Sequence, residues 1–229
     1  MTDWKVKILK VKESALADND ADAEKLRKEN AERGICYYNL MSSPGSGKTT
    51  LLKGTIQRLR DQMRIGIMEA DIDSDVDAEA IAKLGIPAIQ VHTGGMCHLD
   101  ADMSRQGLRE LPLDSLDVVI LENVGNLVCP AEFDTGAWKN LVILSVPEGD
   151  DKPLKYPLMF EKADAVIVNK IDSMDAFDFD CDRVKQNIAE RNPEVPVFFV
   201  SAENGEGMEE WCDWLKQDWE QWKKGVLHE

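Results

Sequence analysis

Short apolar runs alternate with longer amphipathic segments along most of the chain. The short runs are rich in β-branched residues, as expected for strands buried on both faces, whereas the longer segments have helical periodicity. We therefore predict strands at residues 36–41, 64–69, 88–91, 117–121, 141–146, 165–168 and 197–200, and helices at 18–33, 49–62, 76–84 and 208–224. Residues 4–11 alternate loosely and fit either a short strand or an irregular arm.

This alternation predicts an α/β fold with a mainly parallel sheet, right-handed connections and helices on both faces. Residues 1–34 are expected to form an N-terminal arm and a highly charged helix, and residues 35–229 a single globular domain. The last helix is expected to pack on the sheet through one broad side. That side carries Trp211, Trp214, Leu215, Trp219 and Trp222.

A glycine-rich loop, SSPGSGKTT at residues 42–50, lies between a predicted strand and a predicted helix. This context is the one that the Walker A motif of P-loop NTPases requires, although Ser42 stands where the motif usually has its first glycine. Lys48 can reach the β- and γ-phosphates, and the Thr49 hydroxyl is placed to ligate Mg²⁺. We predict a nucleoside triphosphate site made by Gly45, Ser46, Gly47, Lys48, Thr49 and Thr50.

A second motif, Asn169-Lys170-Ile171-Asp172, follows the predicted strand 165–168. A carboxylate at Asp172 can accept two hydrogen bonds from guanine that adenine does not offer, and the stem of Lys170 can lie along the base. Ser201 and Ala202 follow the next strand and complete the pattern. Together these residues predict that the nucleotide is GTP.

An acid and a glycine end the predicted strand 117–121, in the order Glu122-Asn123-Val124-Gly125. Glu122 is placed to hold Mg²⁺ through water and, with Lys48, is the predicted catalytic pair, while the Gly125 N–H is placed to contact the γ-phosphate. Asp71, after the strand 64–69, is the second candidate for Mg²⁺. The alternative is that these are solvated acids of an acidic protein.

Two of the five cysteines have a chemical context that the others lack. Cys97 and His98 lie in a turn before a predicted helix, and Cys129 lies just beyond Gly125. Thiolate and imidazole are ligands preferred by Zn²⁺ and Ni²⁺, and a second copy of the chain would complete the coordination that three ligands leave unfilled. Residue chemistry alone leaves metal ligands and buried thiols both open. Cys36 falls in a predicted strand and Cys212 in a predicted helix; these two and Cys181 are interpreted as packing residues.

The net charge of −16, from 43 acidic and 27 basic side chains, disfavours nucleic acid as a partner. No apolar run approaches the ~20 residues that span a bilayer, and no export signal opens the sequence. We therefore expect a cytoplasmic protein with no membrane or nucleic-acid partner.

These motifs together resemble the HypB family of GTPases, which assist nickel insertion into [NiFe] hydrogenases. The similarity runs from about residue 15 to about residue 215, and its most specific parts are the stretches around Cys97-His98 and Cys129-Pro130. The resemblance implies a GTP-dependent homodimer with nickel or zinc held by Cys97, His98 and Cys129 at the subunit interface. It also implies slow GTP hydrolysis used as a switch, a HypA-type metallochaperone as partner, and the hydrogenase large-subunit precursor as recipient of the nickel.

The sequence departs from the family pattern at three places. The first thirty residues contain no Cys or His, so the N-terminal high-affinity nickel motif of many members is not expected. Ala70 replaces the glycine of a Gly-Asp pair, and Gly95-Met96 stands where Lys-Gly is frequent. Two alternatives remain: a GTPase for another nickel enzyme, such as the urease accessory protein UreG, and a P-loop nucleotide-binding protein with incidental cysteines.

Overall fold

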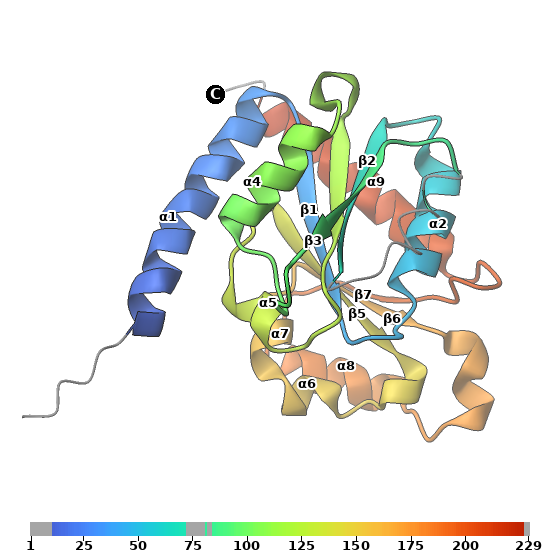
Figure 1. The fold of residues 1–229 in the computed structure, drawn as a ribbon. Helices are drawn as coiled ribbons and strands as arrows, with labels where there is room; N and C mark the ends of the chain where they lie inside the picture. The colour runs from blue at the N-terminus through green and yellow to red at the C-terminus, as the bar shows by residue number, and fades with distance from the viewer. Residues whose placement is uncertain (1–10, 72–80, 82–83, 227–229) are drawn as a thin grey trace, which may run out of the picture.

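The computed structural model describes residues 11–71, 81 and 84–226 of the chain. Within these residues seven parallel strands form one sheet in the order β3-β2-β4-β1-β5-β6-β7 (Figure 1). The strands are β1 (Cys36–Ser42), β2 (Ile65–Asp71), β3 (Ala88–His92), β4 (Val118–Glu122), β5 (Lys139–Ser145), β6 (Ala165–Asn169) and β7 (Val197–Phe199). The predicted α/β fold and parallel sheet are confirmed, and each predicted strand is present to within a few residues.

Helices cover both faces of this sheet (Figure 1). They are α1 (Val11–Glu32), α2 (Lys48–Leu59), α4 (Ala101–Glu110), α5 (Cys129–Glu132), α6 (Lys152–Lys155), α7 (Pro157–Glu161), α8 (Cys181–Ala189) and α9 (Met208–Val226). Short 3₁₀ helices occupy Leu113–Ser115, Val146–Glu148 and Ile171–Ala176 of the described residues. The predicted segment at 4–11, apart from its last residue, and most of the predicted helix at 76–84 lie outside the described residues.

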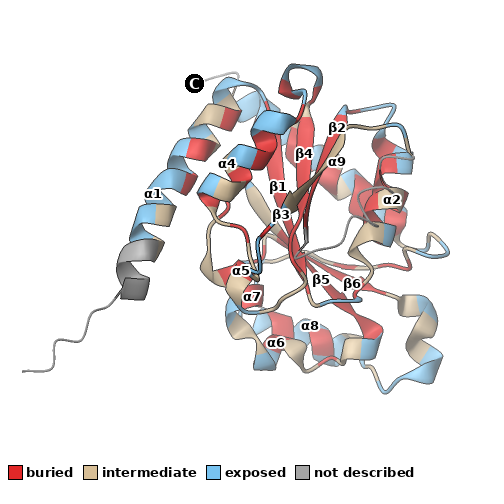
Figure 2. Cartoon of the chain, viewed as in Figure 1, coloured by how far each residue is buried: buried red, intermediate tan, exposed pale blue. Residues whose placement is uncertain are grey.

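One face of the sheet is covered by α2 and α9. Trp211, Trp219 and Trp222 of α9 are buried there, as the spacing of the tryptophans predicts. The Trp211 indole N–H donates to the Thr55 hydroxyl at 3.0 Å, which ties α9 to α2. The buried strand positions on both sides of the sheet form the continuous red core of Figure 2.

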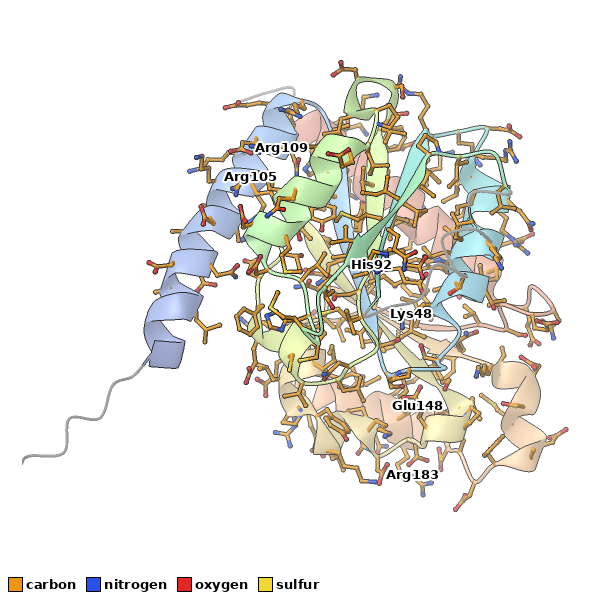
Figure 3. All side chains as sticks on the ribbon, in the orientation of Figure 1. Lys48, His92, Arg105, Arg109, Glu148 and Arg183 are labelled. Atoms are coloured by element: carbon orange, nitrogen blue, oxygen red, sulfur yellow. The ribbon has the colours of Figure 1, made fainter. Side chains whose placement is uncertain are left out.

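The opposite face is divided between two groups of helices. Helices α1 and α4 pack over the β2–β4 half through a cluster that includes Leu26 and Leu108, whereas α7 and α8 pack over the β5–β6 half. Arg105 of α4 bonds Glu29 of α1 at 3.2 Å and the Asp22 carbonyl at 3.1 Å (Figure 3). The N-terminal helix α1 therefore packs against α4. It begins at Val11, seven residues before the predicted start at residue 18.

The centre of the sheet is the point at which the strand order reverses. Strand β1 lies between β4 and β5, so the loops that leave β1 and β4 at their carboxyl ends meet there. In open α/β sheets this switch point is where ligands bind. The predicted nucleotide loop leaves β1 at that edge.

Candidate nucleotide and metal site

The loop after β1 is organised around the side chain of Ser42, the last residue of the strand. The Lys48 ammonium donates to the Ser42 hydroxyl oxygen at 3.0 Å, and the Ser46 hydroxyl donates to it at 2.7 Å. Ser42 is fully buried. The residue that replaces the usual first glycine is thus a polar anchor for Lys48, a role that the motif alone did not predict.

Gly47 is the residue at which the loop turns into α2. Its backbone is left-handed, with φ +95°, and a Cβ there would lie 2.5 Å from the Asn169 amide nitrogen. Asn169 donates through that nitrogen to the Ser46 carbonyl at 2.9 Å. The close approach of the Asn169 side chain therefore depends on the absence of a side chain at Gly47.

Asn169 also joins the loop after β7 to the loop after β1. Its side-chain oxygen accepts from the Ala202 N–H at 3.1 Å. Lys170, which has a left-handed backbone with φ +64°, donates to the Gly45 carbonyl at 2.6 Å. A cavity of about 230 Å³ opens beside them, and it is lined by Gly47, Thr50, Asn169, Lys170, Asp172, Ala202 and Glu203.

These contacts bring together the predicted phosphate loop and the predicted base-reading residues. Ser201 is buried at the edge of the group, where its hydroxyl accepts from the Asn204 N–H at 3.2 Å. Of the residues that line the cavity, Asp172 and Glu203 carry carboxylates, and Asp172 belongs to the predicted base-reading motif. That arrangement suits a flat base with hydrogen-bond donors on one edge.

The predicted Mg²⁺ ligands meet at the start of α2. The Thr49 hydroxyl donates to a Glu122 carboxylate oxygen at 3.0 Å, and Glu122 is 5% exposed. Hydroxyl and carboxylate oxygens are the ligands that Mg²⁺ prefers, so this pair fits the ion. Asp71, the second predicted candidate for Mg²⁺, is the last residue of β2. It follows by two residues Glu69, which pairs in register with Glu122 of β4. The Asp71 side chain lies outside the described part of the structure.

The segment after β4 packs directly on the phosphate loop. A Cβ at Gly125 would lie 2.9 Å from the Pro44 nitrogen, so only glycine allows this approach. The Asn126 N–H donates to the Ser42 carbonyl at 2.8 Å, and the Asn126 side chain accepts from the N–H of Val128 at 2.7 Å and of Cys129 at 3.3 Å. Asn126 therefore connects the phosphate loop to Cys129 through two consecutive contacts.

Cys97, His98 and Cys129 form one cluster although they come from separate segments. One ligand atom from each lies within 4.8 Å of the others, and the two sulfur atoms are 2.8 Å apart. The His98 ring stacks on Phe133, with centroids 3.8 Å apart and planes 15° from parallel. Two thiols and one imidazole within 4.8 Å of one another provide the kinds of donor atom that Ni²⁺ and Zn²⁺ prefer.

The protonation of His98 suits this chemistry. Partial burial lowers the pKa of its imidazole, although the nearby carboxylates of Asp100 and Glu132 act in the opposite direction. A metal ligand must be a neutral imidazole, so the lowered pKa favours the binding form. Burial raises the pKa of Cys36 and, to about 11, that of Cys212, which agrees with their interpretation as packing residues.

Sequence reasoning did not find several residues that shape this site. Phe133 stacks on His98, Asn126 links Ser42 to Cys129, and Glu148 accepts hydrogen bonds from Ser43 and from Ser145. The side chain of Glu148 lies at the same end of the sheet as Lys48 (Figure 3). The only signal for Asn126 was its spacing, since Asn often caps backbone N–H groups two and three residues later.

A larger cavity, of about 470 Å³, lies elsewhere in the structure. Its walls include Tyr37, Trp138 and Trp222, and it contains none of the motif residues. The predicted phosphate loop and the predicted base-reading residues Asn169–Asp172 converge on the smaller cavity instead.

The fold and the site define a P-loop nucleotide-binding protein with a thiol–imidazole cluster beside the nucleotide loop. Residues 36–199 match the family model described as CobW/HypB/UreG, nucleotide-binding domain, and this family implies nucleotide hydrolysis. The chain is 45% identical over 210 residues to hydrogenase maturation factor HypB of Escherichia coli (strain K12), covering 92% of this chain and 72% of that protein. The chain belongs to the HypB family of hydrogenase maturation factors.

Two further relatives are informative. Hydrogenase/urease maturation factor HypB of Helicobacter hepaticus is 42% identical over 215 residues, covering 92% of this chain and 88% of that protein. The crystal structure of HypB from Helicobacter pylori in complex with nickel superposes with a TM-score of 0.85 at 39% identity, covering 89% of this chain and 96% of that one. Among the described residues, no helix is long and apolar enough to cross a membrane.

Proposed function

We propose that this protein is a cytoplasmic GTP-hydrolysing metallochaperone that delivers nickel to the large-subunit precursor of a [NiFe] hydrogenase. The observation that carries the proposal is the continuity of one segment, residues 122–129. It begins at the carboxylate beside Thr49, packs on the phosphate loop at Gly125, and ends at a ligand of the thiol–imidazole cluster. The proposed nucleotide site and the proposed metal site are therefore connected by one continuous backbone segment.

The roles of the phosphate-site residues follow from their positions. Lys48 is held by Ser42 at the loop interior, where its charge can move to the β- and γ-phosphates. Thr49 and Glu122 would hold Mg²⁺, which neutralises charge on the phosphates when bound. The Gly125 N–H would contact the γ-phosphate, and Glu122 would orient the attacking water.

Specificity for guanine is assigned to Asp172. Its carboxylate can accept from the ring N–H and the amino group of guanine, and adenine lacks this pair of donors. In the Asp172→Asn variant we expect affinity for GTP to fall by about 100-fold, because one donor then faces another donor. Affinity for xanthosine triphosphate, which carries a carbonyl in place of the amino group, should rise. Calorimetric titration measures both, and displacement of GTP by ATP at equal concentration would refute the guanine assignment.

The metal cluster is proposed to be shared by two copies of the chain. Three ligands do not fill a tetrahedral or square-planar site, and the apolar neighbours of two of them, Met96 and Val128, are 42% and 48% exposed. A two-fold interface would bury these side chains and complete the coordination. A related protein is described in complex with nickel, which supports nickel as the cargo.

Metal stoichiometry tests this proposal. Equilibrium dialysis against Ni²⁺ or Zn²⁺ should give about one metal per dimer for the unchanged protein, and the Cys97→Ala variant should lose it. Cys181→Ala is the matched control, since Cys181 lies outside the cluster and should leave the stoichiometry unchanged. Equal metal binding by the Cys97→Ala variant would rule the cluster out.

A HypA-type metallochaperone is the proposed partner, and urease is a second candidate recipient. The second candidate is favoured by the relative from Helicobacter hepaticus, which is described as a hydrogenase/urease maturation factor. Nickel content of each enzyme, measured in cells that carry this protein as their sole maturation factor of this family, distinguishes the two.

A further inference from the structure

The cluster is assembled from two segments that are distant in sequence. Cys97 and His98 precede α4, whose first residue is Ala101, and Cys129 opens α5, which leads to Phe133 and Asp134. The His98–Phe133 ring stack joins the segments on one side of the cluster. Something must also fix the backbone of one segment relative to the other, because two thiols form a metal site only if their separation is held.

The N-terminal helix supplies this connection through one side chain. The Asn19 side-chain oxygen accepts from the Ala101 N–H at 2.9 Å, and its side-chain nitrogen donates to the Asp134 carbonyl at 2.9 Å. Ala101 is fully buried, and its N–H belongs to the first turn of α4, where no acceptor within the helix exists. Asn19 thus satisfies one backbone group from each ligand-bearing segment.

Two ion pairs keep α1 in the position from which Asn19 can act. The Arg27 guanidinium bonds the two Asp134 carboxylate oxygens at 2.9 and 2.6 Å and the Ala137 carbonyl at 3.2 Å. On the α4 side, Arg105 bonds Glu29. The helix is therefore attached to both segments independently of Asn19, and the Asn19 amide is the single side chain of the described residues that bonds both at once.

We infer that Asn19 is a positioning residue of the metal cluster, and that α1 is for this reason a structural part of the metal site. This inference rests on the proposed function in that it names a residue that prepares the proposed cluster. The two hydrogen bonds of the Asn19 side chain go to backbone groups and not to the ligand side chains. It acts by setting the distance between the backbone that carries Cys97 and the backbone that carries Cys129.

The test measures that distance without metal or nucleotide. In a glutathione buffer Cys97 and Cys129 equilibrate by the reaction in which two thiols and one glutathione disulfide give one protein disulfide and two glutathione thiols. The equilibrium constant reports the effective concentration of one thiol at the other. Quenched samples are digested, and mass spectrometry of the peptides quantifies the Cys97–Cys129 pair.

We expect the Asn19→Ala variant to lower this equilibrium constant about fivefold or more, since two hydrogen bonds that fix the segments are lost. The Asn19→Asp variant keeps the acceptor for Ala101 and loses the donor to Asp134, so it should give an intermediate value. Asp20→Ala is the matched control: Asp20 is the next residue of α1, is exposed, and changes helix propensity in the same direction.

Nickel affinity, measured by competition with a chromophoric chelator, should follow the same order of variants. An Asn19→Ala equilibrium constant equal to that of the Asp20→Ala control would overturn the inference. If the unchanged protein binds no nickel while the thiol equilibrium still follows the expected order, the proposed function fails, and what stands is that Asn19 sets the distance between Cys97 and Cys129. Equal affinity of all variants for a GTP analogue shows that each variant is folded. If the Asn19→Ala variant does not fold, the Asn19→Asp variant is compared with the Asp20→Ala control instead.

Discussion

At the scale of single residues, the nucleotide loop depends most on Gly47. It combines a left-handed backbone with a neighbouring side-chain amide that fills the space of a Cβ. An L-residue in that conformation costs about 1–2 kcal/mol before any displacement of Asn169 is counted. The backbone strain and the displacement of Asn169 would both distort the loop that is proposed to bind the phosphates.

We therefore predict that Gly47→Ala lowers nucleotide affinity by at least about tenfold, the factor that ~1.4 kcal/mol produces. Fluorescence titration with a labelled GTP analogue measures it. Gly225→Ala is the matched control, because a Cβ at Gly225 meets nothing within 4 Å and its backbone is not left-handed. Equal affinity of both variants would mean that the bound loop has a different shape.

Asp150 gives a prediction about acid stability. Its carboxylate accepts from Arg183 at 2.6 Å and from the Asp180 N–H at 2.9 Å, and the hydrogen bond from Arg183 holds the pKa of Asp150 below its ordinary value. Because the pKa of Asp150 is lower in the folded protein than in the unfolded chain, its ionised carboxylate stabilises the fold at pH values above the unfolded-state pKa of about 3.9. This stabilisation is lost as the pH falls through the folded-state pKa.

The Asp150→Asn variant should therefore unfold more easily than the unchanged protein near neutral pH, with the difference shrinking as pH falls below about 4. Urea unfolding monitored by tryptophan fluorescence between pH 7 and pH 3 measures the free energies. A difference that stays constant across this range would mean that the ionised carboxylate contributes nothing.

At the scale of elements, the loop from β4 to α5 joins the two halves of the site. The backbone of Asn126 bonds the phosphate loop and its side chain bonds the first turn of α5. Removing the side chain breaks the second link and leaves the first. In the proposed function, Asn126 is therefore the residue at which nucleotide binding and metal binding are expected to be separable.

We predict that Asn126→Ala leaves GTP-analogue affinity within about twofold, while the change in nickel affinity caused by the analogue falls severalfold. Paired nickel titrations with and without the analogue measure this coupling. Asn204→Ala is the control, since Asn204 makes the same kind of bond, to the Glu206 N–H, in a loop away from the cluster. Unaltered coupling in the Asn126→Ala variant would place the connection elsewhere.

Secondary structure was largely predictable at this scale. Strands β1, β4 and β6 are buried at every residue, so their apolar runs predict them directly. Helix α1 is longer than predicted because its early part has no apolar periodicity to mark it. Its attachment to α4 and to Asp134 depends on charged and amide groups, which periodicity does not detect.

At the scale of the whole molecule, the exposed apolar side chains beside the cluster are the feature that bears on the proposed two-fold interface. Val128 precedes Cys129 and Met96 precedes Cys97, so each ligand segment presents an apolar side chain to solvent. Charge placed there should oppose the proposed two-fold interface by desolvation and like-charge repulsion.

We predict that Val128→Asp reduces the dimer fraction by about tenfold or more in the presence of nickel and a non-hydrolysable GTP analogue. Size-exclusion chromatography with light scattering measures the mass, with metal-free and nucleotide-free samples as references. A dimer of undiminished stability in this variant would locate the interface on another face.

The sequence by itself determined the fold, and it predicted the chemistry of the site. Apolar runs, the glycine-rich loop, Asn169–Asp172 and the Cys97–His98 pair are local patterns, and local patterns follow from backbone geometry and residue type. Only the tertiary structure decided which separate segments share a contact. The bond between Thr49 and Glu122, the bond from the Asn126 N–H to the Ser42 carbonyl and the bridging position of Asn19 each join segments that are distant in sequence, and no spacing along the chain encodes those contacts.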